Sequence, residues 1–330
     1  MAGGTDVDYG TGVAVSGRNV YVTGTSENDQ ANTKGVVFGS GGPLPGLHPQ
    51  PGTSAQSNRN LLLAKYTDYG TSAAFGWSRV AGGDHGGESH AVAVQGSSVY
   101  VAGALVNSPT GPARPRLGPG HLATPDLGLM QRWLLAKYLD LGDHAALGWC
   151  QTAGGDGGGV AYALAVSGRS IYVLGDADND RANSLHVRFG SRGLEAGPYP
   201  APGLSGRVGA CNILAKYTDH GTSGAFSWLR VDGGTDYFRG SSLVARGPWV
   251  YVRGYSFFNR TPSRRGIAGG ARRRPGPGQR GTPRYLVKNI PYVAGYLDLG
   301  SYAARRWVRV LDYARAGIYL VLSLHGPRLY

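Results

Sequence analysis

The sequence has few cysteines, few charged residues and no long apolar run, and each shortage excludes a class of protein. Two cysteines, Cys150 and Cys211, are too few for a disulfide scaffold or a cysteine-based zinc cluster. No stretch of about 18 apolar residues occurs, so we expect no membrane span. Charged residues make up only 16% of the chain, which leaves few of the polar residues that helix surfaces need. These shortages argue against a helical or membrane-spanning protein.

Glycine and proline are abundant instead, with 56 and 19 residues in a chain of 330. Both interrupt helices and favour turns. Hydrophobic residues nevertheless make up 41% of the chain, too many for a disordered polypeptide. A chain that is rich in turn residues and still apolar is typical of many short strands joined by tight turns. The composition therefore predicts an all-β fold.

The net charge of +13 is concentrated in the last quarter of the chain. Residues 1–238 carry 16 Lys and Arg against 18 Asp and Glu, whereas residues 239–330 carry 17 against two. The arginine-rich stretch 261–284 contains no aromatic residue, and nucleic-acid sites usually combine basic and aromatic side chains. We therefore interpret this stretch as a solvated loop and do not expect a nucleic-acid partner.

Three landmarks recur along the chain with one period of 72 or 79 residues, which is the mark of a tandem repeat. The first is a tryptophan, the second a Val-Tyr-Val or Ile-Tyr-Val triplet, and the third an Ala-Lys-Tyr triplet with a weaker echo in the last copy. They lie at Trp77, Trp149, Trp228 and Trp307; at 20–22, 99–101, 171–173 and 250–252; and at 64–66, 136–138, 215–217 and 294–296. We infer four units, at about 1–79, 80–151, 152–230 and 231–309, with a partial unit at 310–330.

Each unit contains four strand candidates and two turns. A short turn holding Gly17, Gly96, Gly168 or Gly247 joins the first two strands as a hairpin. An Asp-x-Gly turn, first seen at 68–70, joins the last two, because Asp bonds its local backbone and Gly tolerates positive φ. We expect Lys65, Lys137 and Lys216 to snorkel at a blade edge. Four antiparallel strands repeated head to tail predict a β-propeller, with Tyr and Trp filling the space between blades. A β-solenoid is the competing architecture, but its repeats are usually shorter.

Residues 9–24, 62–72 and 75–83 resemble the bacterial β-propeller repeat (SBBP-type) proteins. The resemblance covers residues 1 to about 254 well and 284–310 poorly. It implies a secreted or cell-surface bacterial repeat protein of the Bacteroidetes kind, and it implies no catalytic residues.

The two ends of the chain depart from the pattern of that family. Residues 1–4 lack the basic start and apolar run of a signal peptide, and they align with 80–83, the junction after a tryptophan strand. Residues 317–321 resemble the opening hairpin of a further unit. We expect a piece of a longer array, which leaves ring closure open.

Carboxylates cluster at the junctions between units. If the first strand of each unit is innermost, these residues lie near the central channel, where they could hold a cation or a polyhydroxylated ligand. The competing and favoured interpretation is that Gly-Gly-Asp simply forms the turn between blades. The candidate ligand-binding residues are Asp6, Asp8, Asp84, Asp156 and Asp236.

A second candidate site opens the long loop of the third unit. Asp176, Asp178 and Asp180 place carboxylates on alternate residues, as an EF-hand calcium loop does. Such a loop also needs Gly at its sixth position and Glu at its twelfth, where this chain has Arg181 and Val187. We therefore disfavour a calcium site at this loop, and we expect no other cofactor.

No motif for catalysis occurs: there is no H-x-H, H-E-x-x-H, G-x-S-x-G or phosphate-loop pattern. We expect a monomeric, non-enzymatic scaffold or binding module that meets carbohydrate or protein on its loop-bearing face. One alternative is a polysaccharide-active enzyme with axial carboxylates. Another is a degenerate fragment without a function of its own.

Overall fold

The structure is a computed structural model, and it describes residues 2–3, 8–27, 36–38, 46–48, 59–82, 86–106, 117, 131–154, 158–178, 186–189, 198–200, 211–232, 237–257, 289–310, 322, 324–325 and 328–329. Every regular element in this part of the chain is a β-strand, so the predicted all-β fold is confirmed. Within the same residues, no helix long and apolar enough to cross a membrane is found.

Four antiparallel four-stranded sheets form the body of the molecule, one for each repeat unit. Blade 1 contains β2 (Tyr9–Ser16), β3 (Asn19–Glu27), β6 (Arg59–Asp68) and β7 (Ala73–Ala81). Blade 2 contains β8 (Gly87–Gln95), β9 (Ser98–Val106), β10 (Gln131–Asp140) and β11 (Ala145–Gly154). Blade 3 contains β12 (Gly158–Ser167), β13 (Ser170–Asp178), β16 (Cys211–Asp219) and β17 (Gly224–Asp232). Blade 4 contains β18 (Tyr237–Arg246), β19 (Trp249–Phe257), β20 (Asn289–Asp298) and β21 (Ala303–Val310).

Glycine forms both kinds of turn within a blade. Gly17 and its three equivalents have φ between 55° and 60°, and Gly70 and its equivalents have φ between 86° and 102°. Residues with a Cβ rarely adopt these values, which explains why glycine recurs at both positions. At the second turn the Asp68 Oδ1 atom accepts the Gly70 N–H at 2.7 Å. The Asp-x-Gly motif is therefore a local turn, as predicted.

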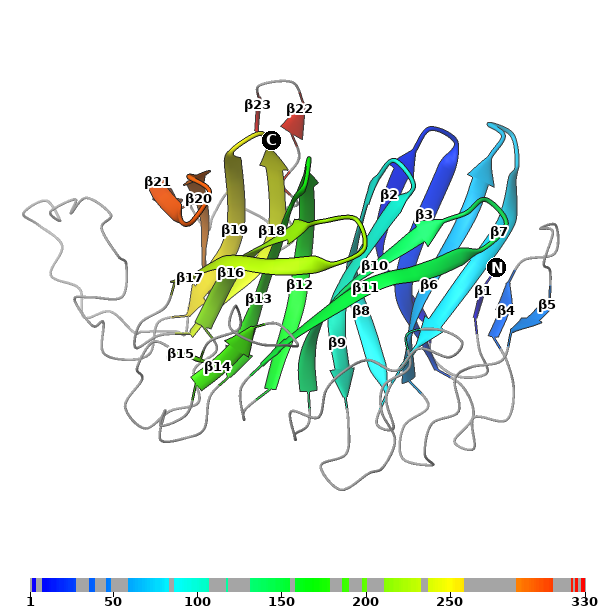
Figure 1. The fold of residues 1–330 in the computed structure, drawn as a ribbon, viewed down its shortest axis with the longest axis horizontal. Helices are drawn as coiled ribbons and strands as arrows, with labels where there is room; N and C mark the ends of the chain where they lie inside the picture. The colour runs from blue at the N-terminus through cyan, green and yellow to red at the C-terminus, as the bar shows by residue number, and fades with distance from the viewer. Residues whose placement is uncertain are drawn as a thin grey trace, which may run out of the picture.

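The blades lie side by side in chain order as a fan (Figure 1). The first strands β2, β8, β12 and β18 are the inner strands, and each contacts the next. The described residues form no closed ring, because β2 and β18 stand at opposite ends of this series. The fold is thus a set of propeller-like blades arranged in an open arc.

The core lies between the blades, not within one of them. Each of the three large buried clusters combines side chains from neighbouring blades. In the first, Tyr21 and Trp77 of blade 1 pack with Val92 and Tyr138 of blade 2. The predicted role of the recurring Tyr and Trp residues as filling between blades is therefore confirmed.

Short strands from the long connections add to this frame. In the third unit, β14 (His186–Phe189) and β15 (Pro198–Pro200) extend the sheet of blade 2 beyond β11. In the first unit, β4 (Val36–Phe38) and β5 (Gly46–His48) pair with β1 (Ala2–Gly3). Both pairings place an Ala-Gly pair opposite a strand that ends in Phe. The two connections therefore share one arrangement.

A last hairpin is formed by β22 (Leu324–His325) and β23 (Arg328–Leu329). His325 pairs with Arg328, as Arg246 pairs with Trp249 in the opening hairpin of blade 4. Residues 317–321, where the sequence predicts such a hairpin, lie outside the described residues. The described hairpin follows them directly.

Candidate functional site

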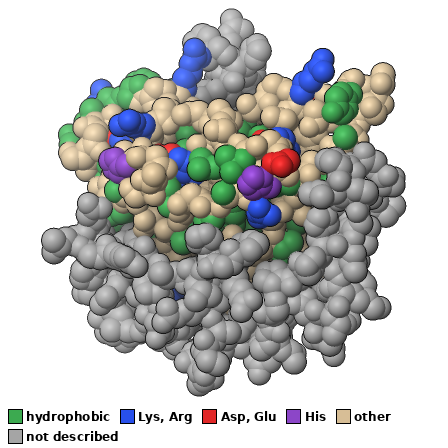
Figure 2. All heavy atoms as spheres, turned by 45° about the vertical axis from the view of Figure 1, so that its right-hand side comes forward, with side chains coloured by type: hydrophobic (Ala, Val, Ile, Leu, Met, Phe, Trp, Pro, Cys, Tyr) green, Lys and Arg blue, Asp and Glu red, His purple; other side chains and the backbone are tan. Residues whose placement is uncertain are grey.

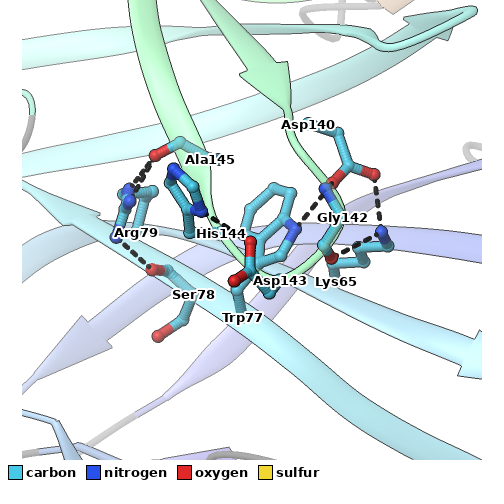
Figure 3. Close-up of polar contacts among 9 residues, drawn as sticks. All are labelled: Lys65, Trp77, Ser78, Arg79, Asp140, Gly142, Asp143, His144 and Ala145. Atoms are coloured by element: carbon cyan, nitrogen blue, oxygen red, sulfur yellow. Dashed lines mark hydrogen bonds and ion pairs between the residues drawn. The ribbon is translucent and has the colours of Figure 1, made fainter.

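The recurring residues of the repeat meet at the junction between blades. At the junction of blades 1 and 2, the carboxylate of Asp140 accepts three hydrogen bonds from blade 1. Figure 3 shows the two that come from Lys65 and Trp77. The Tyr21 hydroxyl lies 2.6 Å from Oδ2, the Lys65 Nζ 2.7 Å from Oδ2, and the Trp77 Nε1 2.9 Å from Oδ1. Each donor comes from a different strand of blade 1: β3, β6 and β7. We call this arrangement of Tyr, Lys, Trp and Asp the junction lock.

The lock occurs at all three junctions with nearly the same geometry. Asp219 accepts from Tyr100 at 2.6 Å, Lys137 at 2.6 Å and Trp149 at 3.1 Å. Asp298 accepts from Tyr172 at 2.6 Å, Lys216 at 2.6 Å and Trp228 at 3.2 Å. In each case the glycine two residues later also donates its N–H to the carboxylate. One carboxylate therefore closes a turn and joins two blades.

The lysines of the lock are buried, which corrects the expectation that they snorkel at a blade edge. The side chains of Lys65 and Asp140 are only 7% and 6% exposed, and those of the other two pairs are similarly enclosed. A charge removed from water needs an opposite charge and hydrogen bonds to be tolerated. The lysine recurs because the buried aspartate of the next unit requires it.

The titration of the lock follows from this enclosure. Burial alone raises the pKa of the Asp219 carboxyl, but hydrogen bonds from Lys137, Tyr100, the Gly221 N–H and Trp149 outweigh it and lower the pKa to about 2. The same balance lowers the pKa values of Asp140 and Asp298. Burial and the hydrogen bond to Asp219 raise the pKa of the Tyr100 hydroxyl. The lock therefore holds an ionised carboxylate at neutral pH and performs a structural role.

A different set of residues lines the inner strands. Each inner strand contains one β-bulge at the same place, two residues before the apolar triplet of the strand. A bulge re-aims the side chain it carries, and bulges are frequent beside functional sites. The bulged residues, which we call the inner row, are Thr11, His90, Tyr162 and Ser241.

The centre of the inner row contains a chain of polar contacts across blades 2 and 3. The His90 Nε2 lies 3.2 Å from a Glu88 carboxylate oxygen, and the His90 ring lies 5.6 Å from the Tyr162 ring, centroid to centroid. The Tyr162 hydroxyl in turn donates to the Asp176 Oδ2 at 2.7 Å. His90, Glu88 and Tyr162 are half-buried, so this part of the row combines two rings and one carboxylate near the solvent, and the buried Asp176 carboxylate holds the Tyr162 hydroxyl.

The two ends of the row carry hydroxyls. The Thr11 hydroxyl donates to the Ser89 carbonyl at 2.7 Å, which joins blade 1 to blade 2. On blade 4, the Arg253 guanidinium donates to the Ser241 hydroxyl at 3.1 Å and to the Tyr255 hydroxyl at 2.7 Å. From blade 1 to blade 4, the row therefore presents a hydroxyl on blade 1, two rings and a carboxylate on blades 2 and 3, and a hydroxyl beside a guanidinium on blade 4.

The row lies at the end of the blades where the long connections leave. In blade 1, Tyr9 at the start of β2 pairs with Thr25, two residues before β3 ends. The bulge at Thr11 therefore lies opposite Thr23 and Gly24, close to the end of β3 at Glu27, from which the long connection starts. The predicted loop-bearing face and the inner row belong to the same end of the molecule.

Of the five predicted junction carboxylates, only Asp8 lies among the described residues. Its Oδ1 atom accepts the Glu27 N–H at 3.2 Å, which ties the start of β2 to the end of β3. Asp6, Asp84, Asp156 and Asp236 lie outside the described residues. The prediction of a carboxylate ring therefore stays a prediction.

The predicted calcium residues are described only in part. Asp176 is buried, and its two carboxylate oxygens accept the Val160 N–H at 3.3 Å and the Tyr162 hydroxyl at 2.7 Å. The side chain of Asp178 and all of Asp180 lie outside the described residues. In the part of the chain that is described, no three His, Cys, Asp or Glu side chains are grouped so as to hold a metal ion.

The sequence interpretation missed the inner row. No motif marks it, because the four bulged residues are chemically different. The available signal was their common position, two residues before the apolar triplets that begin at Val13, Val92, Leu164 and Leu243. In the view of Figure 2, described charged side chains of both signs lie scattered over the surface.

Comparison with known proteins adds no relative: no protein-family model matches the sequence, and no curated protein matches it closely. The candidate site therefore has to be judged from its own geometry.

Proposed function

We propose that this protein is a non-enzymatic binding module that binds carbohydrate along its inner row. The observation that supports this is a contrast between equivalent positions. The four lock positions keep one residue type at every junction, whereas the inner-row position holds a different residue in each blade. Loops and loop-bearing ends of a rigid scaffold are where binding residues usually lie. The inner row lies at such an end, and its residue type differs from blade to blade.

The chemistry of the row suits a polyhydroxylated ligand. Sugars present many hydroxyl donors and acceptors together with apolar C–H faces. The row offers hydroxyls at Thr11 and Ser241 and adjacent rings at His90 and Tyr162, with Glu88 beside them. Binding sites typically combine aromatic walls with a few fixed polar groups. The row crosses all four inner strands.

The resemblance of the repeats to secreted bacterial repeat proteins supports an extracellular or cell-surface setting for this function. A protein ligand on the same face is the competing outcome. The enzyme alternative depends on Asp84, Asp156 and Asp236, which lie outside the described residues.

A glycan array, screened with the purified protein with and without calcium, tests the proposal. We expect binding to one glycan class, and we expect His90→Ala and Tyr162→Ala to weaken it at least tenfold, since removing one aromatic contact in a binding site costs roughly 1–3 kcal/mol. The unfolding midpoint should change little in His90→Ala and should fall in Tyr162→Ala, which also removes the hydroxyl bound to the buried Asp176. Tyr302→Ala is the matched control, because this tyrosine is exposed on a turn away from the row.

Two results would contradict the proposal. The first is the absence of binding to any glycan in either condition. The second is binding that the inner-row variants leave unchanged, which would place the site elsewhere. A dependence on calcium that Asp176→Asn abolishes would revive the predicted calcium site.

A further inference from the structure

The two ends of the arc are complementary, and blade 1 exposes a face that every other blade buries. On β2, Val13 and Val15 are 65% and 61% exposed. The equivalents of Val13 on the other inner strands are buried against the preceding blade: Val92, Leu164 and Leu243 are 9%, 8% and 6% exposed. The equivalents of Val15, which are Val94, Val166 and Ala245, are half-buried in the same clusters. A large apolar side chain that is exposed at a position built for contact marks an interaction surface.

Blade 1 also presents the acceptor half of a junction lock. Asp68 occupies the position of Asp140, and its Oδ1 atom already accepts the Gly70 N–H at 2.7 Å. Asp68 is exposed, and no side chain of another described blade donates to it. The turn therefore holds a carboxylate in the geometry that receives Tyr and Trp at the three complete junctions. We call Val13, Val15 and Asp68 the leading face.

Blade 4 presents the donor half. Its Tyr251 and Trp307 rings lie 6.0 Å apart, and the corresponding pairs at the complete junctions lie 6.0 to 6.2 Å apart. Gly295 stands in the position of the lysine. The fourth blade therefore keeps two of the three donors. We call Tyr251, Gly295 and Trp307 the trailing face.

The C-terminal segment packs on blade 4 beside β18, on the side that carries the trailing face. With the repeat spacing of 79, Leu322 is the equivalent of Leu243 and thus of Val13. Leu322 is 8% exposed, and its N–H donates to the Ser242 hydroxyl of β18 at 3.0 Å. Among the described residues, the β22–β23 hairpin that follows it has two residues in each strand. A short stand-in therefore holds the place of the next inner strand.

We propose that two copies of this chain associate head to tail, with the leading face of one copy on the trailing side of the other. Val13 replaces Leu322 beside β18, and Asp68 accepts hydrogen bonds from Tyr251 and Trp307. The eight-residue β2 and nine-residue β3 replace the two-residue strands of the stand-in hairpin. This proposal differs from the monomer expected from the sequence, and the experiment below decides between them.

A closed pair of two copies would satisfy both faces of each copy. Each copy carries one leading and one trailing face, so the contact is heterologous, and such contacts close into a ring when the rotation allows it. Two copies with four blades each give eight, the upper end of the range of about four to eight blades found in propellers. Because the lysine is absent, this junction lacks an ion pair, and the association is expected to be reversible.

Light scattering coupled to size-exclusion chromatography, over a range of protein concentrations, tests the proposal on the full chain. We expect the mass to rise from one chain to two. Val13→Asp should keep the protein monomeric, and Asp68→Asn and Tyr251→Phe should each weaken association roughly tenfold, the effect of losing one hydrogen bond to a charged group. Leu322→Ser should strengthen association, because it weakens the stand-in.

Leu141→Asp is the matched control, since Leu141 is an exposed apolar residue outside both faces. A monomer at every concentration, in the wild type and in Leu322→Ser alike, would overturn the proposal. So would a dimer that Val13→Asp disrupts but Tyr251→Phe and Leu322→Ser leave unchanged, because that pattern indicates two leading faces in contact. A dimer that Leu141→Asp disrupts equally would indicate nonspecific apolar association.

Discussion

The junction locks and the inner row lie in the same four sheets and follow opposite rules. At each of the three junctions, Tyr, Lys, Trp and Asp recur with donor–acceptor distances between 2.6 and 3.2 Å. Along the inner row the same backbone bulge carries Thr, His, Tyr or Ser. Constant side chains hold one blade to the next, and the ligand site that we propose uses the positions that vary.

Removing the lysine of one lock should give the largest loss of stability. Lys137→Met leaves the Asp219 carboxylate buried without its cation, and breaking a buried ion pair in this way costs about 3–5 kcal/mol. Urea unfolding followed by tryptophan fluorescence measures the loss. His90→Ala in the inner row, the matched comparison, should change stability by less than about 0.5 kcal/mol. Equal losses in the two variants would break the division between lock and row.

Acid should weaken the locks at low pH. The pKa of Asp219 is lowered to about 2 in the folded protein, below the ordinary value of 3.8. A depressed folded-state pKa contributes stability that is fully present above the unfolded value and is lost as the pH falls toward the folded one. We therefore expect the urea midpoint to drop between about pH 4 and pH 2.

The variant Asp219→Asn tests this assignment. It should be less stable than the wild type at neutral pH, and its midpoint should depend less on pH within that window. Asp140 and Asp298, whose pKa values are also lowered, leave a residual slope. An unchanged slope in the variant would mean that other carboxyls control the acid response.

The sequence predicts the scaffold well because the scaffold repeats. Turn glycines, strand triplets and the filling role of Tyr and Trp can all be identified from residues that recur every 72 or 79 positions. The role of the lysine cannot be identified in this way. Lys137 meets Asp219 82 residues later, in the next unit, and a period relates equivalent residues without showing which of them touch.

The inner row escapes sequence analysis for a different physical reason. A bulge is a property of pairing between two strands, and no single residue type encodes it. Its four residues share a position but no chemistry, so neither a motif nor a repeat search selects them. The predicted junction carboxylates, by contrast, share both a residue type and a place in the repeat, and Asp8 is engaged in a backbone contact.

The smallest expected effect comes from comparing the lock tyrosine Tyr100 with Tyr251, its equivalent in blade 4, where the lock is incomplete. Tyr100→Phe removes one of the hydrogen bonds to a carboxylate that retains Lys137 and Trp149, so we expect a loss of about 1.5 kcal/mol, the lower end for bonds to charged groups. Tyr251 holds the same position in blade 4, where no described aspartate receives it. Tyr251→Phe should therefore change the unfolding free energy by less than about 0.5 kcal/mol at low protein concentration. If both substitutions cost the same, the tyrosine contributes through packing, and the lock is held by its lysine and tryptophan alone.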